Sequence, residues 1–347
     1  MNDITILGGG LSGLTIAYLL KQKGIKARVL EARDRVGGRS YSLKSHDAVV
    51  DLGATWIWPH HHHVGQLIEQ LGVETYPQYE TGYSLFEMPQ EVQVFQLQDS
   101  NFPKRFTHGA QEMSLKLAEK LDEGQLCLNA RASKITRQDD HIEITLSNGE
   151  TIKSKRLVLA IPPRVIGATM IFAPKLGESL RRAQQKTYTW MGNSAKAIIT
   201  FLTPFWRERE LSGFCFSEVG PLRELHDHSP NDRRHGVIKG FFADWKSFVG
   251  DPEERKASVI QQLVRLYGSE AANHIDYHDY AWWQDDLSSV VNDRVPLKNH
   301  TWYGHQEFLK GTWDDMLYFA GTETALTQGG YLDGAVESAL RTVRLLA

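Results

Sequence analysis

Short apolar runs of strand length recur along this chain and alternate with stretches of helical spacing. After the run at residues 4–7, one helix face is marked by Leu14, Ala17, Tyr18 and Leu20. Further strand-length runs occupy residues 26–30, 142–146, 157–161 and 317–320. Residues 334–346 repeat the helical spacing with Ala335, Ala339 and Leu340. Alternating strands and helices of this kind predict an α/β fold.

A glycine-rich turn joins the first predicted strand to the first helix. It contains Gly8, Gly10 and Gly13 in GxGxxG spacing, and Ser12 stands at the helix start. Gly8 permits a tight bend, Gly10 lets the backbone approach a pyrophosphate, and Gly13 allows close packing of helix on strand. Free N–H groups and the helix dipole favour phosphate there. The turn therefore predicts a dinucleotide site.

An acidic residue stands where such a site requires one. The second strand ends at Glu31, 18 residues after Gly13, which is the position of a carboxylate that binds a ribose hydroxyl. A carboxylate repels a 2′-phosphate, so FAD or NAD is favoured over NADP, and the fingerprint does not separate those two. Gly37, Gly38 and Arg39 follow, and they add a second backbone approach and a permanently charged partner for pyrophosphate.

A second glycine-rich segment lies near the other end of the chain. It runs from Phe319 through Gly321, Thr322 and Glu323, and continues at Gly329-Gly330-Tyr331. Together with the first turn, these motifs resemble the flavin-containing amine oxidases, the family of monoamine, polyamine and L-amino-acid oxidases. The resemblance implies a Rossmann-like, glutathione-reductase-like FAD-binding domain with a smaller mixed-sheet α+β substrate domain.

The resemblance also implies which residues bind FAD. In the family, the segment from Glu31 to Arg39 binds adenosine and pyrophosphate, the backbone near Ala132 lies by the adenine, and residues 49–56 pass along the isoalloxazine. The N-terminus of the last helix points at the flavin pyrimidine ring, where its dipole stabilises negative charge. The implied cofactor-binding residues are Gly8, Gly10, Ser12, Gly13, Glu31, Ala32, Arg33, Gly38, Arg39, Gly53, Ala54, Thr55, Trp56, Ala132, Gly321, Thr322, Gly330, Tyr331, Leu332 and Ala335.

Two residues are implied to act on the substrate. Lys196 matches a family lysine that holds a water against flavin N5, and burial would lower the pKa of its ammonium. Strand alternation alone leaves open whether Lys196 points to the flavin or to solvent. Tyr331 matches an aromatic wall that orients the substrate amine, and a core tyrosine is the alternative.

The chain departs from the family in two places. Full-length members are about a hundred residues longer, and the missing part falls between Tyr83 and Thr107, where residues 91–97 look strand-like. We therefore expect a more open active site, which a protein partner or second copy could cover. Around residues 287–292 the flavin-linking Cys and following aromatic of some relatives are absent. This predicts non-covalent FAD and half of the aromatic cage, with Trp282 and Trp283 serving as sheet anchors or as another wall.

Composition narrows the function classes. A formal charge of −3 gives no basic field for nucleic acid or anionic membranes. Cys127 and Cys215 form no CxxC pair, and no secretory signal or long apolar run is visible, so a cytoplasmic protein is expected. The run His60–His63 is expected to lie at the surface of a helix start, with lining of the site entrance as the alternative. No metal site is predicted, because no Cys or carboxylate cluster completes a set of ligands.

The resulting expectation is a discontinuous FAD domain, residues 1–80, 109–165 and 310–347, with a substrate domain at 81–108 and 166–309. The expected activity is an FAD-dependent oxidase that moves hydride from the carbon beside an amine to flavin N5, with O₂ as electron acceptor. Two other classes stay open: a flavin dehydrogenase or desaturase on a non-amine substrate, and a flavin-binding partner protein with little oxidase activity.

Overall fold

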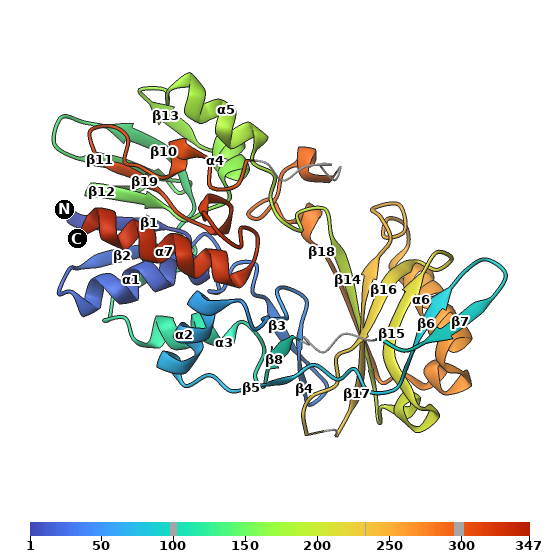
Figure 1. Ribbon diagram of the computed structural model, residues 1–347. Helices are drawn as coiled ribbons and strands as arrows, with labels where there is room; N and C mark the ends of the chain where they lie inside the picture. Colours follow the sequence, from blue (N-terminus) through green and yellow to red (C-terminus); the bar gives the residue numbers. More distant parts are fainter. Residues whose placement is uncertain (98–102, 233, 295–301) are drawn as a thin grey trace.

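The computed structural model describes residues 1–97, 103–232, 234–294 and 302–347. The chain forms two lobes, each built around its own sheet, and both termini lie on the first lobe (Figure 1). Within these ranges no helix combines the length and the apolar character needed to cross a membrane.

The first lobe contains an eight-stranded sheet in the order β13-β10-β11-β12-β1-β2-β9, with β19 also paired to β12. Its centre is parallel, since β1 pairs in parallel with β2 and β12, and β12 with β19. The strands are β1 (Asn2–Leu7), β2 (Ala27–Leu30), β9 (Leu126–Cys127), β10 (Ala132–Arg137), β11 (Ile142–Leu146), β12 (Thr151–Leu159), β13 (Ile171–Ala173) and β19 (Leu317–Phe319).

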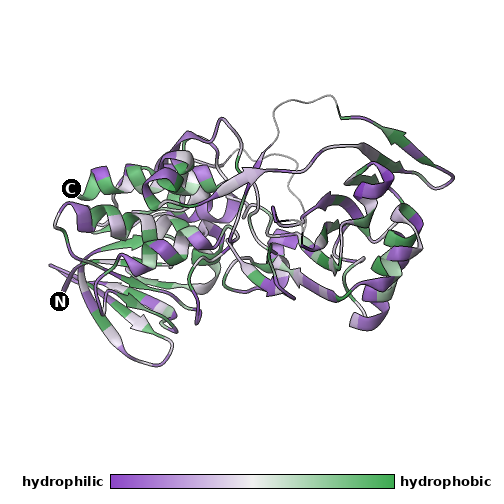
Figure 2. Cartoon of the chain, turned by 90° about the horizontal axis from the view of Figure 1, so that it is seen from below, coloured by the Kyte–Doolittle hydropathy of each residue, from purple (hydrophilic) through white to green (hydrophobic). Residues whose placement is uncertain are grey.

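Helices cover this sheet and bury its apolar side chains. The helix α1 packs on α7, and α2 packs on α7 and α3, with Leu14, Ile16 and Val336 in their shared core. Figure 2 shows apolar and polar positions alternating along these helices, as expected for helices with one buried face. The helices of this lobe are α1 (Leu11–Gln22), α2 (His62–Leu71), α3 (Glu112–Glu119), α4 (Pro163–Thr169), α5 (Glu178–Lys186) and α7 (Leu332–Leu346).

The second lobe contains a seven-stranded sheet in the order β18-β14-β17-β16-β15-β6-β7. The helix α6 (Pro252–Tyr267) packs Val259 and Leu263 into the core of this lobe, and the hairpin of β6 and β7 projects from its edge (Figure 1). The strands are β6 (Tyr83–Glu87), β7 (Val92–Phe95), β14 (Ala195–Phe201), β15 (Leu211–Ser217), β16 (Leu222–Asp227), β17 (Gly236–Phe242) and β18 (Asp276–Ala281).

Two small sheets complete the structure. The hairpin of β3 (Ser42–Ser45) and β4 (Ala48–Asp51) packs Val50 and Leu52 against Ile198 and Val237 of the second lobe. The other pair is β5 (Thr75–Pro77) with β8 (Lys104–Phe106). Short 3₁₀ turns occur at η1 (Phe205–Arg209), η2 (Ser269–Asn273), η3 (Trp282–Gln284), η4 (Val291–Arg294), η5 (Gln306–Phe308) and η6 (Thr322–Thr324).

The predicted α/β class with a second mixed-sheet lobe is confirmed, and the strand-length runs named above correspond to strands. The domain limits differ from the expected ones. Residues 171–173 were assigned to the substrate domain, yet β13 pairs in parallel with β10 of the first sheet. The helix α5 places Leu180 and Ala183 in the same core, beside Phe308. The first lobe therefore continues past residue 165 and resumes before residue 310. Residues 98–102 and 295–301 of the expected substrate domain lie outside the described residues.

Candidate active site

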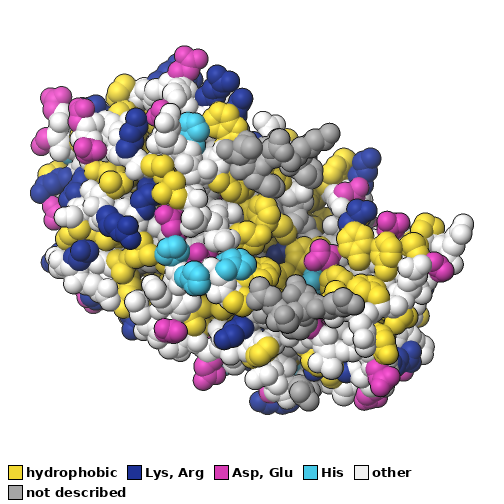
Figure 3. Space-filling model, in the orientation of Figure 1, with side chains coloured by type: hydrophobic (Ala, Val, Ile, Leu, Met, Phe, Trp, Pro, Cys, Tyr) yellow, Lys and Arg dark blue, Asp and Glu magenta, His cyan; other side chains and the backbone are white. Residues whose placement is uncertain are grey.

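A cavity of about 830 Å³ lies between the two lobes. Figure 3 shows the hollow there, bordered largely by hydrophobic side chains. Lys196 and the predicted cofactor-binding residues line it, with Gly13 as the exception. One continuous cavity thus brings together segments from both ends and the middle of the chain.

The glycine turn forms one end of the cavity. Gly8 has φ +107°, a left-handed conformation that favours glycine, and it leads from β1 into α1. A Cβ on Gly13 would lie 2.0 Å from the carbonyl oxygen of Gly8, so Gly13 permits the contact between α1 and β1 without facing the cavity. Gly10 and Gly37 pair in an isolated bridge and both line the cavity. Because neither has a side chain, backbone atoms form the cavity wall there.

Glu31 is 3% exposed and its carboxylate is fixed by backbone N–H groups. Its Oε2 accepts a hydrogen bond from Gly9 N at 2.6 Å, and Oε1 accepts one from Arg33 N at 2.9 Å. The carboxylate is thereby oriented at the mouth of the glycine turn. This is the placement expected for an acid that binds a ribose hydroxyl.

The two arginines expected near the pyrophosphate are already paired within the protein. Arg33 donates to both carboxylate oxygens of Asp285, from the second lobe. Arg39 forms a two-point ion pair with Glu323, at 2.5 Å and 2.9 Å. The pairing of Arg39 was not predicted, because sequence motifs do not reveal a partner 284 residues away, and its role at the pyrophosphate stays a prediction. Arg39 also donates to the backbone oxygen of Trp190.

Replacing Arg39 by methionine is expected to lower the free energy of unfolding by about 3 kcal/mol, because the fully buried Glu323 carboxylate would lose its cation. Denaturant unfolding measures the loss. The control Arg209→Met removes an exposed pair with Glu270, and it should cost at most about 1 kcal/mol. Equal losses in the two variants would contradict the structural role of the Arg39–Glu323 pair.

Lys196 points into the cavity and not to solvent. The side chain on β14 is 5% exposed, and Nζ donates a hydrogen bond of 2.6 Å to Gly53 O. Burial lowers the pKa of its ammonium to about 8, although the charges of Asp51 and Glu224 oppose the shift. Gly53 has no room for a side chain, since a Cβ would lie 2.1 Å from Arg39 O. The structure thus settles the direction of Lys196, which strand alternation left open.

A second buried lysine was missed by the sequence reasoning. Lys239, from β17, donates to the hydroxyl of Thr55, and burial with the nearby Lys196 charge holds the pKa of its ammonium well below the ordinary value. It lies cross-strand from Ile198, two positions along β14 from Lys196. Only the alternation of β17 opposite β14 could have indicated this placement.

Tyr331 stands in a group of aromatic rings at the N-terminus of α7. Its ring centroid lies 5.7 Å from that of Trp58, 5.3 Å from His61 and 5.4 Å from Trp190. Trp58 and Trp190 also line the cavity. Trp190 therefore gives this part of the cavity a further aromatic wall beside Tyr331, one that no sequence motif had indicated.

The histidine run begins α2, as expected, but its side chains differ in exposure. His60 and His62 are exposed, whereas His61 is 3% exposed behind Tyr331. His63 Nδ1 lies 3.0 Å from Asp333 Oδ2, and Asp333 also accepts from the Val64 N–H. The surface assignment is thus wrong for His61. Asp333 joins the start of α2 to the first turn of α7.

The two tryptophans that follow β18 have different surroundings. Trp282 lines the cavity and donates to Leu52 O, whereas Trp283 packs in the core of the second lobe. Leu287 and Ser288 also line the cavity. Cys127 lies beside Arg28, and Cys215 is buried in the second-lobe core. Neither thiol faces the cavity, so the chain offers no cysteine for a bond to a flavin.

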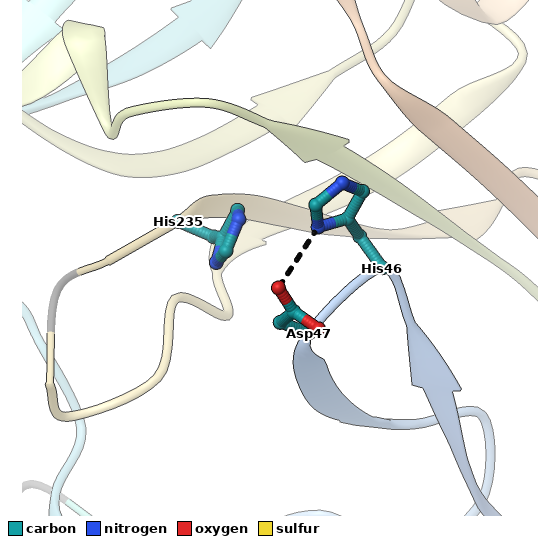
Figure 4. A group of neighbouring side chains, drawn as sticks. All are labelled: His46, Asp47 and His235. Atoms are coloured by element: carbon teal, nitrogen blue, oxygen red, sulfur yellow. Dashed lines mark ion pairs between the residues drawn. The ribbon is translucent and has the colours of Figure 1, made fainter.

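One group of possible metal ligands was not predicted. His46, Asp47 and His235 place their ligand atoms within 4.8 Å of one another (Figure 4). His46 and Asp47 are exposed, and none of the three lines the cavity. This group is therefore separate from the candidate active site.

The cavity fits an FAD molecule. Its volume lies in the range of pockets that enclose whole ligands. The bare backbone at Gly10 and Gly38 and the oriented Glu31 suit the adenosine and pyrophosphate end. The walls at Gly53 and the start of α7 suit a flat ring system. The residues present are thus those that a dinucleotide flavin requires.

The sequence matches the family described as flavin containing amine oxidoreductase over residues 11–104 and 82–347. It is 26% identical to a probable flavin-containing monoamine oxidase A from Dictyostelium discoideum, over 98% of this chain and 96% of that protein. It is 24% identical to the flavin-containing amine oxidase B of Homo sapiens, over 99% of this chain and 85% of that protein.

Solved structures share the fold. A putrescine oxidase with bound putrescine has a TM-score of 0.86 at 20% identity, over 99% of this chain and 98% of that chain. Cyclohexylamine oxidase from Brevibacterium oxydans IH-35A has a TM-score of 0.86 at 16% identity, with the same coverage. The alignment with the Dictyostelium protein spans 444 positions, so about a hundred of them hold no residue of this 347-residue chain.

The family match spans nearly the whole chain, and the cavity joins the glycine turn, Glu31, Lys196 and Tyr331 in one site. The protein is an FAD-dependent oxidoreductase of the flavin-containing amine oxidase family.

Proposed function

We propose that this enzyme oxidises an amine at the part of the cavity wall formed by Lys196 and Tyr331, with oxygen as electron acceptor. The observation that carries the proposal is the buried Lys196 ammonium on the same cavity as the glycine turn and Tyr331. The flavin, when bound, supplies the acceptor for two electrons from the amine. The cofactor-binding role of the residues named above is part of this proposal.

The chain's own residues orient the substrate amine and accept or donate protons. Lys196 Nζ, which donates a hydrogen bond to Gly53 O, can also hold a water in place. Above about pH 8 its ammonium has lost a proton, and the neutral amine can then accept one. Tyr331 and Trp190 offer aromatic faces that orient a substrate nitrogen. The N-terminus of α7 begins beside Tyr331 and favours negative charge.

Oxygen uptake with a panel of amines tests the proposal. The balance requires one O₂ and one water consumed, and one H₂O₂ formed, for each amine converted to aldehyde and ammonia. We expect that ratio for at least one amine. Reduction of a dye by amine without oxygen uptake would support a dehydrogenase instead, and co-purification of another chain without any reduction would support a partner protein.

Location and assembly belong to the same proposal. Both cysteines are free thiols, which suits a reducing, cytoplasmic compartment. The β6–β7 hairpin exposes Val92 and Val94, and it falls in the interval where the resemblance places the segment missing from this chain. A partner or second copy that covers the active site stays a prediction.

A further inference from the structure

Glu80 is a carboxylate on the cavity wall that no described residue neutralises. It follows β5 and precedes β6, and it lines the cavity together with Trp56, Phe214 and Phe241. Its side chain is only partly accessible. Within the described ranges no group donates a hydrogen bond to its carboxylate, and no cation pairs with it.

The other carboxylates on the described wall already have partners. Glu31 accepts from Gly9 N and Arg33 N. Glu224 is bonded to His226 at 2.7 Å, and this bond holds the pKa of Glu224 below its usual value. Among these wall carboxylates, Glu80 is therefore the one whose acceptor oxygens no described residue occupies.

The charges around Glu80 do not stabilise its ionised form. Burial and the negative charge of Asp227 raise the pKa of Glu80 to about 7. Asp227 itself is saturated by Arg207 and Trp206. The described cations on the same wall are engaged elsewhere. Lys196 bonds Gly53 O, Arg131 pairs with Asp286, and Arg223 lies over the Phe216 ring. Arg33 and Arg39 hold the ion pairs given above. A positive ligand would supply the partner that no described residue provides.

Aromatic side chains line the same cavity as Glu80, and two of their rings lie close to buried lysines: Lys239 Nζ is 5.0 Å from the Trp56 ring centroid, and Lys196 Nζ is 5.0 Å from that of Phe241. The Trp56 and Phe241 rings stack at a centroid distance of 6.1 Å, and Trp56 is held by a hydrogen bond to Gln78, two residues before Glu80. An ammonium can be bound by a carboxylate together with aromatic faces.

We propose that Glu80 binds a second positive charge on the substrate, so that the enzyme prefers amines that carry another cationic group apart from the amine that reacts. This inference rests on the proposed amine oxidation. It names Glu80 as a residue that determines specificity, and a diamine or polyamine as the substrate class.

The test compares unbranched diamines with monoamines of the same chain length, using FAD-loaded enzyme. We expect the best diamine to have a higher kcat/KM than its monoamine. In Glu80→Gln this preference should fall at least about tenfold, because a hydrogen bond to a charged group is lost, while monoamine rates stay nearly unchanged. The wild-type preference should also grow as pH rises through about 7, where Glu80 ionises. The control Glu74→Gln changes an exposed acid on the same segment and should keep the preference.

Thermal unfolding gives a readout that does not need turnover. Diamines should raise the unfolding temperature of the wild type more than monoamines do, and Glu80→Gln should lose this difference. If no amine is oxidised but the diamine shift persists and depends on Glu80, the proposed oxidation fails and the binding role stands. Equal behaviour of wild type and Glu80→Gln in both assays would overturn the inference, as would an equal loss for monoamines and diamines.

The stability of Glu80→Gln across pH tests whether Glu80 lacks a partner in the folded protein. The folded-state pKa of Glu80 is raised above its unfolded value of 4.5, so its ionisation destabilises the fold as pH rises from about 4.5 to about 7. Glu80→Gln should therefore unfold at a higher temperature than wild type above pH 7, and the two should converge towards pH 4.5. A variant less stable than wild type at every pH would show that Glu80 has a stabilising partner and would overturn the inference.

Discussion

Replacing Gly13 by valine is expected to abolish FAD binding and to lower the free energy of unfolding by about 3 kcal/mol or more. The added Cβ would lie 2.0 Å from Gly8 O and 3.3 Å from the Ala160 side chain, so α1 must move away from β1. Moving α1 also displaces the backbone of Gly10 and Ser12 at the cavity wall. Flavin fluorescence on titration with FAD and denaturant unfolding measure the two effects.

Gly65 supplies the matched control. It is also a helical glycine, in α2, but a Cβ there meets no atom within 4 Å. Gly65→Val should retain FAD binding and change stability by less than about 1 kcal/mol. If Gly13→Val bound FAD as tightly as Gly65→Val, the glycine turn would not be the dinucleotide site.

Lys196→Met is expected to keep FAD bound but to lower kcat/KM for the amine about 100-fold or more. The variant keeps roughly the volume of the side chain. It removes the Nζ group, which bonds Gly53 O and can accept a proton. Since burial lowers the pKa of Lys196 to about 8, wild-type rates should rise as pH increases through that value. The variant should lack this rise. Steady-state rates across pH, with the flavin content measured from absorption, give the comparison.

An exposed lysine serves as the control for this experiment. Lys246 lies on the surface of the second lobe, and Lys246→Met should leave both rate and pH profile unchanged. A Lys196→Met enzyme with wild-type rates and an unaltered rise near pH 8 would remove Lys196 from the reaction. Loss of bound flavin in Lys196→Met would instead assign the residue a structural role at Gly53.

The parts of the site that could be predicted from sequence are those with local motifs. The turn at Gly8 to Gly13 and the acid at Glu31 are fixed by a strand, a turn and a helix that follow one another in the chain. The start of α7 beside Tyr331 follows from a strand and a helix with glycines between them. In each case the backbone conformation requires the residue type, so the pattern carries the information.

The parts that could not be predicted depend on contacts between distant segments. Arg39 pairs with Glu323, and Arg33 pairs with Asp285. Lys239 of the second lobe donates a hydrogen bond to Thr55 of the first. None of these pairs has a characteristic spacing, because tertiary packing alone brings them together. The exposed placement assigned to His61 failed for the same reason, since Tyr331 covers it from the other end of the chain. Glu80 lies in an irregular connection, where no periodicity indicates which side chains face inward.

The limits of the first lobe illustrate a related difficulty. Pro162 and Pro163 follow β12 and cannot continue a strand, but the chain then adds α4 and β13 to the same lobe before it crosses to the second. A strand of three residues gives too short a pattern to be assigned from sequence.

The most direct test of the account is the visible spectrum of the FAD-loaded enzyme, recorded without oxygen before and after addition of each amine. We predict that the flavin band bleaches with an amine, most strongly with a diamine, and returns when oxygen is admitted. A flavin band that every amine leaves unchanged would contradict amine oxidation in this cavity, and a protein that does not take up FAD would contradict the cofactor site itself.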